Sequence, residues 1–138
     1  GVRTVGLRKV WPRGVALHGL DLEMAPGQIS GLLGANGAGK TTTISMLTGL
    51  IPPSAGGATI DGLSIRTQMN AIRLSLGVCP QLNVIFDTLT PLQHLMLYGA
   101  LKGLGGEALF QASTRLLSSV MLSERAHTCA GASRAFEL

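Results

Sequence analysis

The sequence predicts an α/β fold in which a small antiparallel sheet precedes alternating strands and helices. Two segments of alternating apolar residues near the N-terminus are separated by a turn, as in a hairpin. A short apolar run then enters a glycine-rich loop, and a segment with helical spacing leaves it. Further segments with helical spacing occupy the second half of the chain. The length of 138 residues suits one domain.

Five segments are expected to be strands: residues 4–10, 15–24, 28–33, 58–60 and 76–80. The residues Trp11-Pro12-Arg13-Gly14 separate the first two strands, and the Pro26-Gly27 turn opens the third. Residues 28–33 are expected to be a buried strand that enters the glycine-rich loop. A turn at residues 53–57 precedes the fourth strand, and a proline ends the fifth.

Four segments are expected to be helices: residues 41–50, 67–74, 90–103 and 107–121. The first stops at Gly49, with two prolines beyond it. The third has Thr90 as its cap and Pro91 in its first turn. The apolar side chains that follow Pro91 at helical spacing are interpreted as an ordinary core-facing side of the helix.

The composition is that of a globular chain, with 46% hydrophobic and 13% charged residues. The net charge of +4 comes from scattered basic residues, which favours a solvated surface over a nucleic-acid partner. Cys79 and Cys129 form no C-x-x-C pair and fit a reducing compartment. The sequence contains neither an apolar run of about 18 residues nor the apolar core of a signal peptide. Since the chain begins at Gly1 rather than at a methionine, we expect it to be a piece of a longer protein.

The glycine-rich loop carries the most specific motif of the chain, G-x-x-x-x-G-K-[ST] with an additional glycine inside the spacer. Glycines let main-chain N–H groups approach phosphate oxygens, and the dipole of the following helix points at the same place. Lys40 is expected to reach the β- and γ-phosphates, and the Thr41 hydroxyl to bind Mg²⁺. A plain glycine-rich turn would not explain a lysine followed by three threonines. The expected nucleotide-binding residues of the loop are Gly34, Asn36, Gly37, Ala38, Gly39, Lys40, Thr41 and Thr42.

Residues 31–53, together with the Leu-Gly-Val-Cys-Pro-Gln segment that ends at Gln81, resemble the nucleotide-binding domain of an ABC transporter. The Gln81 segment resembles the A subfamily in particular, which consists largely of lipid exporters. The resemblance covers residues 2–121. It implies a P-loop NTPase (RecA-like) core with an N-terminal antiparallel β subdomain and the start of a helical subdomain. By this resemblance, the chain is a partial ATP-binding domain that divides into residues 1–87, residues 88–125 and a divergent tail, residues 126–138.

The resemblance also assigns two residues outside the loop. Trp11 stands where the family has an aromatic residue that stacks on adenine, although a tryptophan half-buried in a turn is the alternative. Gln81 would contact Mg²⁺ or the attacking water as a coordinator, since an amide is not a useful base. Its alternative is a loop glutamine in solvent. The family implies Lys40 and Gln81 as catalytic residues, and residues 81–97 as part of a surface that docks a transmembrane segment.

Other parts of an ABC ATPase are missing from the sequence. No aspartate is followed by a glutamate, and neither a Leu-Ser-Gly-Gly signature nor a suitably placed histidine occurs. We therefore expect a member of an ATP-hydrolase family that binds ATP and Mg²⁺ but does not hydrolyse ATP alone. The neighbours of the loop-entering strand come largely from later sequence in such folds, so exposed sheet edges and apolar surface are also expected.

The resemblance implies two partners, namely transmembrane domains and a second nucleotide-binding domain in a head-to-tail dimer. It places the chain at the cytosolic face of a membrane, coupled to transport, with lipid as the implied substrate of the parent protein. Two alternatives stay open. One is a soluble P-loop nucleotide-binding protein, such as a nucleotide kinase or a non-transporting ABC protein. The other is a truncated, non-catalytic fragment.

Overall fold

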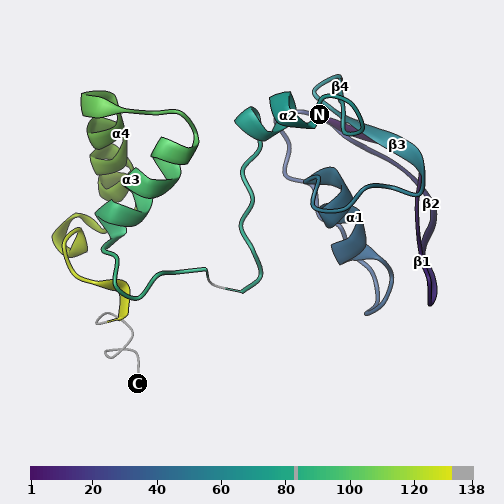
Figure 1. Ribbon diagram of the computed structural model, residues 1–138, viewed down its shortest axis with the longest axis horizontal. Coiled ribbons are helices and arrows are strands. Elements are labelled where there is room, and N and C mark those ends of the chain that lie inside the picture. The colour runs from purple at the N-terminus through teal and green to yellow at the C-terminus, as the bar shows by residue number, and fades with distance from the viewer. Residues whose placement is uncertain (83, 132–138) are drawn as a thin grey trace. The chain divides into compact units, whose positions relative to one another are not determined.

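A four-stranded antiparallel sheet forms the centre of the first of two compact units, residues 1–78 and 79–138 (Figure 1). The structure is a computed structural model that describes residues 1–82 and 84–131. The elements of the first unit are β1 (Val2–Trp11), β2 (Gly14–Met24), α1 (Lys40–Leu47), β3 (Ala55–Ile60), β4 (Leu63–Ser64) and α2 (Met69–Ser75). The elements of the second unit are α3 (Pro91–Leu101), α4 (Gly106–Ser119) and the 3-10 helix η1 (Ser123–Arg125).

The sheet has the strand order β2-β1-β3-β4, so the two longest strands form its first hairpin. At one end of this hairpin Val2 pairs with Met24, and at the other end Trp11 pairs with Gly14. A bulge at Gly6, which has φ 53°, places two exposed residues between the buried side chains of Thr4 and Leu7. The hairpin predicted from the alternating segments is confirmed.

The core of the first unit joins the sheet to both of its helices. Its buried residues are Leu7, Met46, Ala58, Ile60, Ile65 and Ile72. Met46 brings α1 to the sheet, and Ile72 brings α2. Because α1 is anchored through a fully buried methionine, its first turn is held at a fixed place beside the hairpin.

The second unit is a helical pair with a well-defined start. The Thr90 side chain accepts a hydrogen bond from Gln93 N (3.2 Å), and the Gln93 side chain accepts one from Thr90 N (2.9 Å), which completes a capping box. Helices α3 and α4 pack closely at Gly99, where a Cβ would overlap the side chain of Leu109. The cap predicted at Thr90 is confirmed, as are all four predicted helices.

Two of the five predicted strands are wrong. Residues 28–33 and 76–80 have no regular secondary structure, and Ile29 and Leu33 are 105% and 92% exposed. A strand needs a neighbour for its N–H and C=O groups, and no strand of the described residues pairs with either segment. The turn predicted at residues 53–57 is also shorter than expected, because β3 already begins at Ala55, which pairs with Arg8.

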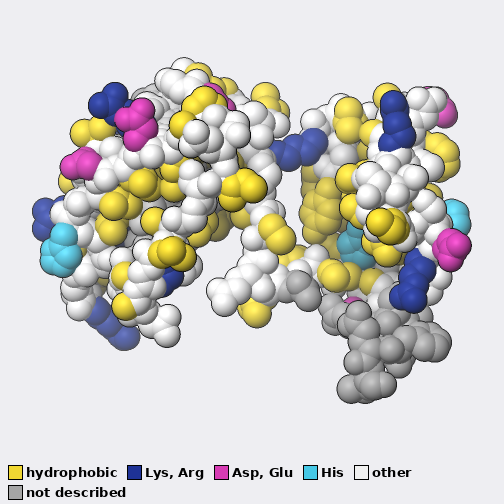
Figure 2. All heavy atoms as spheres, turned by 180° about the vertical axis from the view of Figure 1, so that it is seen from behind, with side chains coloured by type: hydrophobic (Ala, Val, Ile, Leu, Met, Phe, Trp, Pro, Cys, Tyr) yellow, Lys and Arg dark blue, Asp and Glu magenta, His cyan; other side chains and the backbone are white. Residues whose placement is uncertain are grey.

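Hydrophobic side chains lie on the surface of both units (Figure 2), so the expected exposure of apolar surface is confirmed. None of the helices within residues 1–82 and 84–131 is long and apolar enough to cross a membrane. The boundary between the two units falls after Val78. The division into residues 1–87, 88–125 and 126–138 stays a prediction. Most of the tail predicted at residues 126–138 lies outside the described residues.

Candidate nucleotide-binding site

The glycine-rich loop leads directly into the first turn of α1. Gly37 and Gly39 adopt φ 83° and φ 87°, in the left-handed region that favours glycine. Ala38 N donates to Ala35 O (3.1 Å), which closes a tight turn around Asn36 and Gly37. The loop is exposed from Gly34 to Ala38. Its backbone is therefore bent as a phosphate cradle requires and stays open to a ligand.

Gly39 is the point where the loop meets the sheet. A Cβ at this position would lie 2.7 Å from the Ala16 carbonyl oxygen and 3.2 Å from Leu17 Cδ1. Both of these residues belong to β2. Only a glycine fits here without displacing α1 or β2, so this contact holds the end of the loop against β2.

The Lys40 side chain folds back over the loop. Its ammonium donates to the carbonyl oxygens of Gly34 (2.6 Å) and Ala35 (2.8 Å). These two bonds use two of the three N–H donors of the ammonium. The positive charge is thus held at the mouth of the loop, where it can attract an anion.

The start of α1 adds further donors. Thr43 is buried, and both its N–H (2.8 Å) and its hydroxyl (3.0 Å) donate to Gly39 O. The backbone N–H groups that precede Thr43 at the start of α1 have no intrahelical carbonyl acceptor, as at any helix start. Thr41 is exposed and Thr42 is half-buried. Backbone donors, a helix N-terminus and an ammonium together suit a polyphosphate.

Trp11 lies near this loop along the hairpin. It ends β1 opposite Gly14, and Ala16, which contacts Gly39, follows on β2 two residues later. Because neighbouring residues of a strand are only about 3.3 Å apart, Trp11 and the glycine-rich loop (the phosphate loop from here on) lie at the same end of the hairpin. Trp11 is 44% exposed. The structure therefore places an open aromatic side chain within the unit that carries the loop.

Lys9 is a residue of this region that the sequence interpretation missed. It is only 8% exposed, its ammonium lies 4.5 Å from the centroid of the Trp11 ring, and it donates to Pro52 O (2.8 Å). The available signal was its position two residues before Trp11, which puts both side chains on one face of a strand.

Gln81 belongs to the second unit, where it is exposed in an irregular segment. Its contact with Mg²⁺ or water stays a prediction. Within residues 1–82 and 84–131, no group of three or more His, Cys, Asp or Glu side chains could hold a metal ion.

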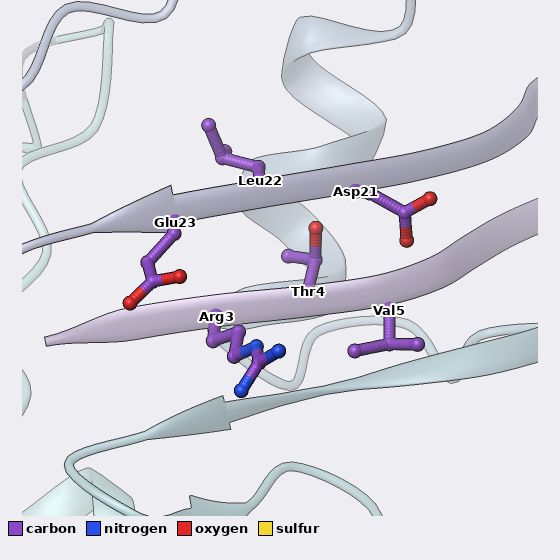
Figure 3. Close-up of a pocket in the computed structure, with 6 residues that line it drawn as sticks. All are labelled: Arg3, Thr4, Val5, Asp21, Leu22 and Glu23. Carbon is purple, nitrogen blue, oxygen red and sulfur yellow. The ribbon is translucent and has the colours of Figure 1, made fainter.

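A depression in the surface of the hairpin lies away from the glycine-rich loop. It has a volume of about 510 Å³ and is open to solvent. Figure 3 shows the residues that line it on β1 and β2: Arg3, Thr4, Val5, Asp21, Leu22 and Glu23. The Thr4 hydroxyl donates to Leu20 O (2.7 Å) and Asp21 accepts from Gly6 N (2.6 Å), so these polar groups serve the sheet itself. This depression lies toward the Val2–Met24 end of the hairpin, opposite to Trp11.

The phosphate loop and its fold are those of a known family. The family model described as ABC transporter matches residues 17–135 of this chain. The chain belongs to the ABC transporter family. The family resemblance based on the loop and the Gln81 segment is therefore confirmed, and the match extends further toward the C-terminus than expected.

Relatives of this ABC chain lie in the A subfamily, as the Gln81 segment predicted. It is 48% identical over 131 residues to ATP-binding cassette sub-family A member 7 of Mus musculus, a match that spans 93% of this chain and 6% of that protein. It is 50% identical over 124 residues to Phospholipid-transporting ATPase ABCA7 of Homo sapiens, which spans 88% of this chain and 6% of that protein. The chain thus corresponds to less than a tenth of the length of these relatives.

Solved structures confirm the P-loop NTPase fold of this ABC chain. The "Structure of ATP binding subunit of ABC transporter" superposes with a TM-score of 0.79 at 27% identity, covering 93% of this chain and 53% of that one. A dimeric post-hydrolysis state of the ATP-binding cassette MJ0796, bound to ADP and Pi, gives 0.78 at 22% identity, covering 94% and 62%. The second comparison shows the fold alone.

Proposed function

We propose that this chain binds Mg-ATP through residues 34–42 and Trp11, as the ATP-binding part of an ABC transporter ATPase domain. The observation that carries the proposal is the bent loop with the Lys40 ammonium held at its mouth by two loop carbonyls. ABC ATPase domains bind ATP, and the MJ0796 structure contains ADP and Pi.

Each residue of the site has a distinct proposed role. The backbone N–H groups of the loop and of the first turn of α1 receive the phosphate oxygens. Lys40 exchanges its loop carbonyls for the β- and γ-phosphates, and the Thr41 hydroxyl is a ligand for Mg²⁺. The exposed Trp11 ring stacks on adenine. A bound Mg²⁺ would neutralise phosphate charge, with Thr41 and Gln81 as its proposed ligands.

The same chemistry limits what the chain does with bound ATP. Phosphoryl transfer to water needs charge neutralisation and a positioned water. Lys40 and Thr41 supply the first, but the seven acidic residues include no adjacent Asp-Glu pair to supply the second. We infer that this chain binds ATP without hydrolysing it at ordinary ATPase rates.

The parent function is proposed from the relatives. One of them is named a phospholipid-transporting ATPase, and the dimeric state is that of a related cassette. On this basis the chain would pair with a second nucleotide-binding domain and with transmembrane domains at the cytosolic face of a membrane, and couple ATP to lipid transport. The scattered basic residues give no support to a nucleic-acid partner.

Trp11 is the only tryptophan of the chain, so its fluorescence tests the proposal directly. Titration with Mg-ATP is expected to change the emission, and Lys40→Ala is expected to raise the Kd about tenfold to a hundredfold through the loss of charged hydrogen bonds. Lys102→Ala, the same change in the second unit, is the matched control. No response up to millimolar Mg-ATP would refute binding. Phosphate release that Lys40→Ala abolishes would refute the inference on hydrolysis.

A further inference from the structure

We propose that Lys9 is a positioning residue for adenine recognition: its buried ammonium covers one face of Trp11 and leaves the opposite face to the base. The inference rests on the proposed binding of ATP at this site. It concerns a residue that contacts neither phosphate loop nor nucleotide in the proposed arrangement, and that acts through Trp11.

The first support is the geometry of three groups. The Lys9 ammonium lies 4.5 Å from the centroid of the Trp11 ring, within the range of about 6 Å over which a cation and an aromatic face attract. The same ammonium donates to Pro52 O at 2.8 Å. The ammonium therefore contacts the Trp11 ring, and its hydrogen bond to Pro52 O holds it in that position.

The second support is burial. Lys9 is 8% exposed, although lysine is among the residues least often buried without a partner. Among residues 1–82 and 84–131, no carboxylate forms an ion pair with Lys9. The compensation for burying this charge therefore comes from the Pro52 carbonyl and the Trp11 ring, which makes the ring contact a part of the local structure.

The third support is the connection to the phosphate site. Pro52 lies on the segment that leaves α1, the helix that begins at the phosphate loop. The same segment is tied to β1 by Ser54, whose N–H donates to Arg8 O (2.9 Å) and whose hydroxyl accepts from Val10 N (3.0 Å). Lys9 thus ties the aromatic side chain to the segment that follows α1, the helix whose first turn is proposed to bind the phosphates.

Because stacking uses a single face of the indole, the ligand that gains from this arrangement is a purine or another flat base. A bare polyphosphate gains nothing from Trp11. The effect of Lys9 should therefore appear with Mg-ATP and be absent with Mg-tripolyphosphate, which occupies the loop alone.

The test measures both ligands on the full 138-residue chain and on Lys9→Gln, which keeps a donor for Pro52 O but removes the charge. We expect the Kd for Mg-ATP to rise about threefold to tenfold, and the Kd for Mg-tripolyphosphate to stay within about twofold. Acrylamide should quench Trp11 more strongly in unliganded Lys9→Gln. Lys9→Arg should restore ATP affinity, since a guanidinium also stacks and donates. Arg8→Gln, an exposed change of equal charge on the same strand, is the control.

A double-substitution cycle decides whether Lys9 acts through the ring. In the Trp11→Ala background, Lys9→Gln should leave the Kd for Mg-ATP unchanged; an equal loss in both backgrounds would overturn the proposal. The proposal would also be overturned if Lys9→Gln kept the melting temperature of the unaltered chain but selectively lost affinity for Mg-tripolyphosphate, because Lys9 would then act on the phosphates. If Lys9→Gln does not fold, Lys9→Met is judged by the same comparison. If the unaltered chain does not bind Mg-ATP, the proposed function is refuted. If the unaltered chain and Lys9→Gln bind Mg-ATP equally well, only the inference about Lys9 is refuted.

Discussion

Gly39 joins the phosphate loop to the sheet, and replacing it with alanine is expected to destabilise the first unit. The new Cβ would lie 2.7 Å from the Ala16 carbonyl oxygen, closer than real Cβ contacts come, and this neighbour is backbone. Gly37 is the matched control. It has a similar φ, 83° against 87°, but a Cβ there would meet nothing within 4 Å. The two substitutions differ only in the overlap with β2.

The magnitudes follow from these two contributions. A side chain in the left-handed region costs about 1–2 kcal/mol at either position. Forcing an extra carbon against packed atoms adds about 1–3 kcal/mol at Gly39 alone. The free energy of unfolding should therefore fall by about 1–2 kcal/mol in Gly37→Ala and by about 2–5 kcal/mol in Gly39→Ala.

Urea unfolding followed by Trp11 fluorescence measures this difference, because the single tryptophan lies on β1 in the same unit. The slope of the transition should be unchanged, so that the midpoints report stability. Losses that agree within about 0.5 kcal/mol for Gly37→Ala and Gly39→Ala would refute the reasoning, since they would mean that Gly39 does not press on β2 in solution.

Two further substitutions test the core and the second unit. Ile72→Ala removes a side chain with no exposed area and should lower the free energy of unfolding by about 2–5 kcal/mol, whereas Leu74→Ala, on the same helix and 76% exposed, should change it by less than about 0.5 kcal/mol. Thr90→Ala removes the acceptor for Gln93 N and should cost about 1 kcal/mol, seen as an earlier loss of helical circular dichroism on heating. Thr88→Ala, an exposed change just before the cap, is its control, and equal melting of the two variants would contradict a stabilising role for the cap.

The features predicted best from the sequence are those stabilised by contacts near in the chain. The capping box at Thr90 needs only residues three apart, and the backbone hydrogen bonds of the helix after the phosphate loop join residues four apart. Lys9 was missed for the opposite reason. Alternation along a strand puts it beside Trp11, but the carbonyl that holds its ammonium is 43 residues away at Pro52. Nothing in the local pattern indicates such a partner.

The two wrong strands show how the site is supported. Residues 28–33 precede the phosphate loop, and residues 76–80 precede Gln81. Both were expected to be strands because they are apolar, but an apolar run gains little as a strand unless a neighbour pairs with its backbone. With residues 28–33 irregular and Ile29 fully exposed, the segment before the loop does not set the loop's position. That position depends on two contacts, namely the approach of Gly39 to β2 at the end of the loop and the burial of Met46 in the core after it. The phosphate cradle is therefore held from its helix side, which is why one added carbon at Gly39 is expected to matter more than the same carbon at Gly37.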